Sequence, residues 1–193
     1  MSDERMRRAA EPEPSEGDTR LYEPRIYEHS FKVHDRMRNG RVVVRDSERQ
    51  WDMHRQANSK RYLSPLEPDL QDTCLQSWEV FRQVFPERSG RHRHQGGLVI
   101  FILAGKGYSV YDGERHDWEA GDLLLLPMTP AGIEHQHFNT DPEQPAEWIA
   151  FIYWPFFDHG GCEIIQIESS PLYEAYIARR QNAAQAFRAE EQL

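Results

Sequence analysis

Two pairs of closely spaced histidines are the residues of this sequence best suited to metal chemistry. His92 and His94 lie in the segment RHRH, and His135 and His137 lie in the segment EHQH. Alternate residues of a β-strand point to the same face, so both imidazoles of one pair can aim at one point. Three neutral imidazoles with open coordination positions suit iron, zinc, copper or nickel. The spacing predicts a metal site of His92 and His94, completed by His135 or His137 from a distant strand.

The segment between and around the two pairs is typical of short strands joined by turns. Residues 98–103 and 123–126 are apolar runs, and residues 148–154 form an aromatic run. Asp112-Gly113 is a strong hairpin signal between two of the expected strands. Strands of this length at roughly ten-residue spacing predict an all-β fold, an antiparallel sandwich or barrel.

The flanking regions predict a division of the chain into four parts. We expect a disordered tail at 1–20, an N-terminal arm at 21–70, the barrel at 71–168 and a C-terminal helix at 169–193. In the arm, the spacing of apolar residues supports no long helix, 41–45 is a candidate short strand, and 46–48 offers a helix start. A loosely packed extension is the alternative for this arm. Ser170-Pro171 is typical of a helix N-terminus. The apolar side of that helix would be formed by Leu172, Tyr173, Tyr176, Ile177, Ala184 and Phe187.

The composition of the sequence limits the kinds of binding partner and the cellular compartment that we expect for the protein. The formal net charge of −9 argues against a nucleic-acid or anionic-membrane surface, because both favour an excess of Lys and Arg. Two cysteines are too few for a disulfide framework. The start of the sequence lacks the apolar run of a signal peptide, and no stretch approaches the ~20 apolar residues of a membrane span. We therefore expect a cytoplasmic protein.

The two histidine segments resemble the paired motifs of the cupin family, whose fold is a small antiparallel β-barrel or jelly roll. In the first motif, His92-Arg93-His94 occupies the paired histidine positions and Leu98 stands where a glutamate is usual. The segment PAGIEHQHFN at 130–139 is similar to the end of the second motif. The resemblance implies a single cupin barrel with an N-terminal arm and a C-terminal helix.

The leucine at position 98 narrows the resemblance, because a leucine cannot serve as the fourth metal ligand. The pattern is similar to the ring-cleaving dioxygenases for gentisate, salicylate and 1-hydroxy-2-naphthoate, which use three histidines. This resemblance implies that His92, His94 and His135 bind Fe(II), with zinc, nickel, manganese or copper as alternatives. His137 would be a catalytic non-ligand that hydrogen-bonds the substrate or accepts its hydroxyl proton.

Four further residues are candidates for the substrate pocket. If the alternation of the first histidine pair continues, Leu98 and Ile100 point inward and form an apolar wall. Arg82 could pair with a substrate carboxylate, and Trp154 could stack on an aromatic substrate. The alternatives are barrel core for Ile100, a surface position for Arg82, and core or dimer packing for Trp154.

The leading hypothesis is an Fe(II)-dependent dioxygenase that uses O₂ to cleave a C–C bond of a small oxygenated, aromatic acid. A metal-dependent lyase or isomerase with zinc or nickel as Lewis acid is the second hypothesis. A non-catalytic cupin that binds a small molecule is the third. The expected partners are a small-molecule substrate and O₂, without nucleic acid or membrane. Cupins are commonly dimers, so a homodimer or higher homo-oligomer is expected, with 21–70 as candidate contact region.

Overall fold

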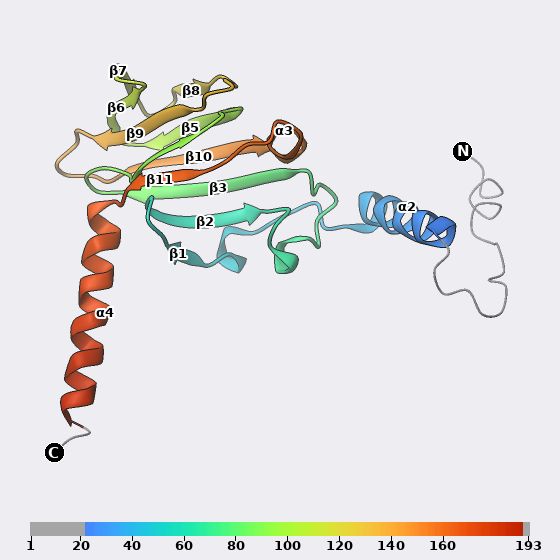
Figure 1. Cartoon of the computed structure of the whole chain (residues 1–193), viewed down its shortest axis with the longest axis horizontal. Helices are drawn as coiled ribbons and strands as arrows, with labels where there is room; N and C mark the ends of the chain where they lie inside the picture. Colours follow the sequence, from blue (N-terminus) through green and yellow to red (C-terminus); the bar gives the residue numbers. More distant parts are fainter. Residues whose placement is uncertain (1–21, 191–193) are drawn as a thin grey trace. The chain divides into compact units, whose positions relative to one another are not determined.

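The computed structural model describes residues 22–190, so the tail expected at 1–20 lies outside the described residues. The described residues form two compact units: 22–43 together with 72–75, and 44–71 together with 76–190. Figure 1 shows the chain with most of its helices and strands labelled. Within 22–190, no helix is both long and apolar enough to cross a membrane.

The first unit contains helix α2 (Tyr22–Asn39), and the expectation of no long helix in this region was wrong. The helix is held by side-chain pairs four residues apart. The Tyr27 hydroxyl donates to Glu23 at 2.9 Å, and Lys32 Nζ lies 2.6 Å from the Glu28 carboxylate. Its larger apolar side chains remain exposed. Because the helix buries no continuous apolar stripe, hydrophobic periodicity could not reveal it.

The prediction of a strand at 41–45 was also wrong. Arg41 makes one isolated parallel bridge to Thr73, and the rest of the segment is irregular. Val42 is 83% exposed. A run of β-branched residues does not form a strand when no neighbouring strand pairs with it. At Asp46–Glu48 the expected helix start is a single 3₁₀ turn.

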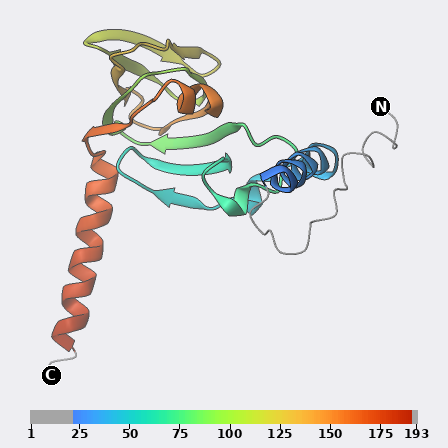
Figure 2. The same ribbon diagram turned by 45° about the vertical axis from the view of Figure 1, so that its right-hand side comes forward.

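The second unit consists of two antiparallel sheets, which confirms the predicted all-β antiparallel architecture. The first sheet has the strand order β1-β2-β3-β10-β5-β8, and the second has the order β11-β4-β9-β6-β7. Figure 2 shows β1 and β2 continuing the first sheet beyond β3. The strands are β1 (Trp51–Met53), β2 (Asn58–Leu63), β3 (Trp78–Phe85), β4 (Arg91–His94), β5 (Leu98–Ala104), β6 (Lys106–Tyr111), β7 (Glu114–Glu119), β8 (Leu123–Leu126), β9 (Ile133–Asn139), β10 (Ala146–Tyr153) and β11 (Ile165–Glu168).

Strand β5 shows how alternation builds the interior. Leu98, Ile100 and Ile102 are at most 4% exposed, whereas Val99 and Phe101 on the other face are 39% and 37% exposed. The inward side chains meet those of the second sheet in one core. The buried apolar side chains of this core are Ala57, Phe85, Leu98, Ile100, Ile102, Trp118, Leu124, Leu126, Ala146, Trp148, Ala150, Ile152 and Phe157.

The hairpin predicted at Asp112-Gly113 joins β6 to β7 with Tyr111 paired to Glu114. Asp112 has a φ of 47° and Gly113 a φ of 89°, the left-handed values that a two-residue hairpin turn requires. This turn fixes the register of β6, the strand that lies next to β9.

The predicted C-terminal helix is α4 (Pro171–Glu190). Its cap is as expected, since the Tyr173 N–H donates to Ser170 Oγ at 3.2 Å. The Ser170 N–H donates to the Arg55 carbonyl at 2.7 Å, which ties the helix start to the β1–β2 hairpin. Of the predicted apolar side, Leu172, Tyr173 and Ile177 are half-buried, Tyr176 and Ala184 are exposed, and the Phe187 side chain is outside the described set. The short helix α3 (Trp154–His159) follows β10.

Candidate metal centre

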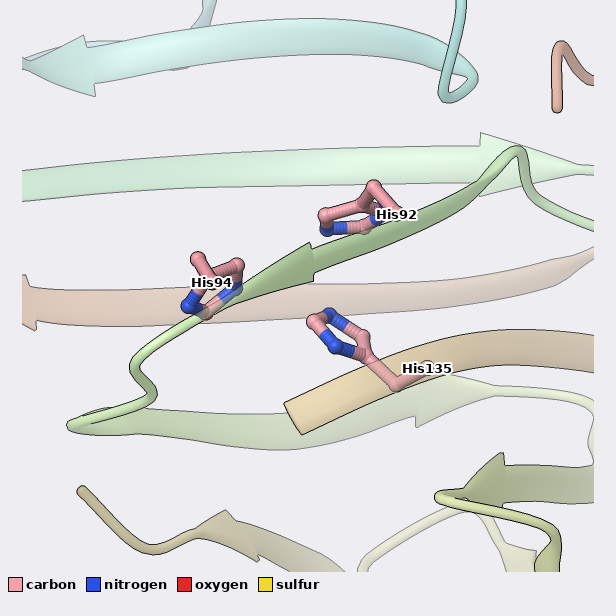
Figure 3. Close-up of side chains that lie close together, drawn as sticks. All are labelled: His92, His94 and His135. Carbon is pink, nitrogen blue, oxygen red and sulfur yellow. The ribbon is translucent and has the colours of Figure 1, made fainter. Parts of the chain in front are cut away.

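Strands β4 and β9 bring three histidines of the two sequence pairs together. The strands pair antiparallel with His92 directly opposite His135. One ring nitrogen from each of His92, His94 and His135 lies within 4.8 Å of the others, and all three residues are buried. Figure 3 shows the three rings facing a common space, two from β4 and one from β9. The geometry therefore selects His135 from the second pair.

The glycine of the PAG turn lets β9 begin this close to β4. Gly132 has a φ of 77°, and a Cβ built on it would lie 3.1 Å from the backbone of His94. A side chain at this position would be strained in φ and would press on the strand that carries two of the histidines. The turn thus places Ile133 opposite His94 and His135 opposite His92.

Two of the three histidines are oriented by backbone carbonyls. His92 Nδ1 lies 3.3 Å from the Gly90 carbonyl oxygen, and His135 Nδ1 lies 3.0 Å from the Ile133 carbonyl oxygen. A carbonyl oxygen only accepts, so each Nδ1 carries the proton and donates it. The Nε2 lone pair of both rings is thereby free for a metal ion, the usual arrangement of metal-ligating histidines.

His94 is held differently. Its Nδ1 accepts the backbone N–H of Gly96 at 3.0 Å, so the neutral ring carries its proton on Nε2. Coordination through Nε2 would require the proton on Nε2 to leave, and coordination through Nδ1 would require the ring to turn away from the Gly96 N–H. If His94 serves as a ligand, metal binding would therefore require a local adjustment at this residue.

Burial keeps the cluster uncharged. Loss of hydration lowers the pKa of His92 to about 3, with the neighbouring His94 adding to the effect, and lowers that of His94 to about 4. Burial, together with His92 and His94, holds the pKa of His135 well below its ordinary value. Three neutral imidazoles in a dry site suit a divalent transition metal, which can enter without displacing protons from Nε2 of His92 and His135.

His137 follows on the same face of β9 but is not one of the three clustered residues. It pairs with Ser109 on β6 and is 1% exposed. Its ring lies 5.5 Å from the Trp148 ring and 6.3 Å from the Tyr111 ring, measured between centroids. Burial and the neighbouring His135 hold the pKa of His137 well below its ordinary value. His137 is a neutral side chain in the interior, next to the three clustered histidines.

The remaining candidate pocket residues fall in different places. Leu98 and Ile100 are on the inner face of β5, as alternation predicts. Arg82 is on the outer face of its sheet, where it pairs with Asp46 at 3.4 Å and with Glu147. The structure thus does not bring Arg82 to the histidines. Trp154 stacks on Phe157 in α3 with ring centroids 4.7 Å apart and packs against the core.

Sequence reasoning missed the side chains that surround His137. Ser109, Tyr111, Trp118 and Trp148 come from β6, β7 and β10, and none of them belongs to a histidine motif. Alternation could place each of them on one face of its own strand. Their meeting depends on β6 pairing with both β7 and β9, which no local pattern encodes.

The two-sheet fold and the buried histidine cluster define a β-barrel protein with a candidate metal site. Residues 81–152, from β3 to β10, match the family model described as a cupin domain. The matched segment carries both histidine pairs.

Two curated dioxygenases share part of this sequence. A gentisate 1,2-dioxygenase from a Ralstonia species is 37% identical over 65 residues, which are 33% of this chain and 17% of the relative. A 5-aminosalicylate 1,2-dioxygenase from a Comamonas species is 32% identical over 103 residues, which are 50% of this chain and 26% of the relative. The chain thus spans about a quarter or less of the length of these relatives.

Solved structures that resemble this one include a salicylate 1,2-dioxygenase from Pseudoaminobacter salicylatoxidans. It has a TM-score of 0.45 and 14% identity, and the match covers 72% of this chain and 36% of that one. A polyketide cyclase from Streptomyces resistomycificus has a TM-score of 0.49 and 13% identity. The match covers 72% of this chain and 93% of the cyclase.

Proposed function

We propose that this protein is an Fe(II)-dependent dioxygenase that cleaves a C–C bond of a small oxygenated, aromatic acid. The observation that carries the proposal is a centre of three buried, neutral histidines with Leu98 at the position of the usual carboxylate. The two curated relatives, a gentisate and a 5-aminosalicylate dioxygenase, support the same class of reaction.

The chain's own residues would perform three tasks in this reaction. His92, His94 and His135 would hold the ion, and the carbonyl contacts of His92 and His135 fix those rings in the ligating orientation. When bound, Fe(II) would supply the redox chemistry that lets O₂ react with an electron-rich substrate. Leu98 and Ile100 would exclude water from one side, and His137 would hydrogen-bond the substrate from another.

The test combines metal analysis with oxygen consumption. Protein reconstituted with Fe(II) should bind about one equivalent and consume O₂ in the presence of gentisate, salicylate or 5-aminosalicylate. His94→Ala should weaken metal binding by more than about 100-fold and abolish oxygen uptake, because loss of a ligand costs more than loss of a ligand's hydrogen-bond partner. His29→Ala, which alters an exposed histidine of α2, is the matched control and should change neither quantity.

Two results would contradict this proposal. Failure of the folded protein to bind Fe(II), or unchanged metal binding in His94→Ala, would remove the metal centre. Turnover of a substrate under strictly anaerobic conditions would instead indicate a lyase or isomerase that uses the metal as Lewis acid.

The proposed enzyme would act as a homodimer in the cytoplasm. The outer face of the first sheet supports the dimer, because it carries a continuous apolar surface across four neighbouring strands. We call this surface the outer apolar face; it consists of Trp78, Val80, Val99, Phe101, Leu103, Leu123, Leu125, Ile149, Phe151 and Tyr153.

The size of the outer apolar face favours a second copy of the chain as its occupant. Leu123 and Leu125 are 58% and 64% exposed, and cross-strand pairs join them to Phe101 and Val99. The face spans four neighbouring strands, a spread of apolar side chains suited to the roughly 800 Å² that each partner of a stable dimer buries. A surface of one sheet can meet its own copy across a two-fold axis, with apolar side chains on both sides.

A further inference from the structure

A chain of hydrogen bonds runs from β7 through β6 to His137 on β9. The Trp118 indole Nε1–H donates to Ser109 Oγ at 2.9 Å. The same Ser109 Oγ lies 2.7 Å from His137 Nδ1. The three residues are between 0% and 4% exposed, so water does not compete for these bonds.

The chemistry of the three groups sets the donor-to-acceptor direction of this series of hydrogen bonds. An indole N–H can only donate, so Trp118 occupies a lone pair of the Ser109 oxygen. The buried Ser109 hydroxyl must then place its own proton on an acceptor. Two side chains neighbour this hydroxyl: His137 Nδ1, which lies 2.7 Å away, and Tyr111, whose hydroxyl can itself donate. The short contact favours His137 Nδ1 as the acceptor. A ring that accepts at Nδ1 and is neutral carries its proton on Nε2.

We propose that Trp118 and Ser109 are positioning residues that hold His137 in the tautomer protonated on Nε2. His137 then donates a hydrogen bond to an oxygen acceptor of the ligand at the metal centre, and it does not act as the base that removes a substrate proton. The tautomer is a property of the protein alone; the identity of the acceptor rests on the proposed function.

Two other buried donors beside His137 point to the class of ligand group. Trp148 Nε1 is buried without a hydrogen-bond partner among the described residues, and the buried Tyr111 hydroxyl has only Ser109 as a neighbouring side-chain partner. Both rings contact the His137 ring. An unpaired buried donor is costly, so this wall favours a ligand that supplies oxygen lone pairs. A carboxylate or a phenolate oxygen of the substrate has that chemistry.

The backbone of β6 is adapted to the position of Trp118. Gly107 pairs with Trp118 across β6 and β7. A Cβ built on Gly107 would lie 2.7 Å from the indole Cη2 atom. Only a glycine leaves room for the indole to lie over β6 and reach Ser109 two residues along the strand.

The tautomer can be measured without turnover. In full-length, ¹⁵N-histidine-labelled protein loaded with Zn(II), which is diamagnetic, long-range ¹H–¹⁵N correlations distinguish Nε2–H from Nδ1–H rings. We expect His137, assigned by its loss in His137→Gln, to show the Nε2–H pattern. An Nδ1–H pattern would overturn the inference, because the Ser109 hydroxyl would then point elsewhere, for example to Tyr111.

Substitutions test the roles of the two positioning residues. Ser109→Ala should convert His137 to a mixture of tautomers, and Ser109→Thr, which keeps the hydroxyl, should restore the Nε2–H form. Trp148→Phe is the matched control: it removes an N–H next to His137 that is not bonded to it, so the tautomer should be unchanged. An unaltered tautomer in both Ser109→Ala and Trp118→Phe would show that neither residue positions His137.

Ligand binding tests the donor role with salicylate as the probe and Zn(II)-loaded protein. Ser109→Ala should weaken salicylate binding by about 5- to 10-fold, the effect of one misdirected hydrogen bond. His137→Gln, which keeps an N–H donor, should bind salicylate within about threefold of the original protein, and His137→Ala should bind more weakly. Equal loss in His137→Gln and His137→Ala would contradict a donor role. Absence of oxygenase activity would contradict the proposed function, but it would not affect the conclusion about the tautomer of His137.

Discussion

At the scale of single residues, burial gives the protein a group of uncharged histidines, and one of them, His54, is not among the three residues of the candidate metal centre. His54 lies in the β1–β2 hairpin, with Nε2 2.6 Å from Ser59 Oγ. Burial, and next the positive charge of Arg61, lower the pKa of His54 to about 4. In the unfolded chain the pKa of a histidine is about 6.5, so protons bind the unfolded state more strongly.

This difference in pKa predicts how stability changes with pH. The contribution of His54 is present above pH ~6.5 and is lost as the pH falls towards 4, because only the unfolded chain takes up the proton. In His54→Gln, the loss of unfolding free energy between pH 8 and pH 5 should be smaller by about 2 kcal/mol. Urea denaturation at the two pH values measures it. His29→Gln, on an exposed part of α2, should behave like the original protein.

At the scale of elements, the site depends on how closely β6 lies against its neighbours. A Cβ on Gly107 would collide with the Phe138 carbonyl oxygen of β9 and also with the Trp118 indole of β7. The strand that carries Ser109 and Tyr111 can therefore pair on both sides only with glycine at this position.

Gly107→Ala should destabilise the protein by more than about 2 kcal/mol, because backbone atoms would have to separate. Gly113→Ala is the comparison: its φ of 89° is strained for alanine, but nothing lies within 4 Å of the new Cβ. It should cost about 1 kcal/mol. Thermal or chemical unfolding of the two variants measures the difference, and equal losses would show that the contact around Gly107 relaxes freely.

Elements also show what sequence could and could not predict. The strands around the site were predictable because alternation and turn residues are local signals, as at Asp112-Gly113. The helix α2 was missed because it buries no continuous apolar stripe, and its side-chain pairs, such as Glu28 with Lys32, lie on the exposed surface. His92, His94 and His135 could be chosen through the family resemblance, whereas the contact of Ser109 with His137 depends on strand pairing across 28 residues.

At the scale of the whole molecule, the outer apolar face predicts the state of association. Leu123→Asp combined with Phe101→Glu would place charges on the surface that we propose to be shared by two copies. Light scattering after gel filtration should report a dimer for the original protein and a monomer for this variant. Val42→Asp with Val43→Asp alters exposed apolar residues outside that face and should leave the dimer intact.

Two observations would argue against a second copy on this face. A monomeric original protein would leave the outer apolar face without its proposed occupant. A dimer that survives the double charge substitution would place the interface elsewhere. Removal of residues 1–20 separates a third case, because a face covered by that segment would become accessible and aggregate after the deletion.

The direct opposition of His92 and His135 across β4 and β9 has a consequence for folding. A strand has a side-chain period of two, so a slip of β9 by one residue would turn His135 and His137 outward together. A metal ion could then bind only the chain with the correct strand register, and its binding energy would add to that state alone. The ion would therefore stabilise the correct pairing of β4 with β9 over the shifted one. Refolding with Zn(II) present should therefore give a higher yield of native protein for the original sequence than for His135→Ala.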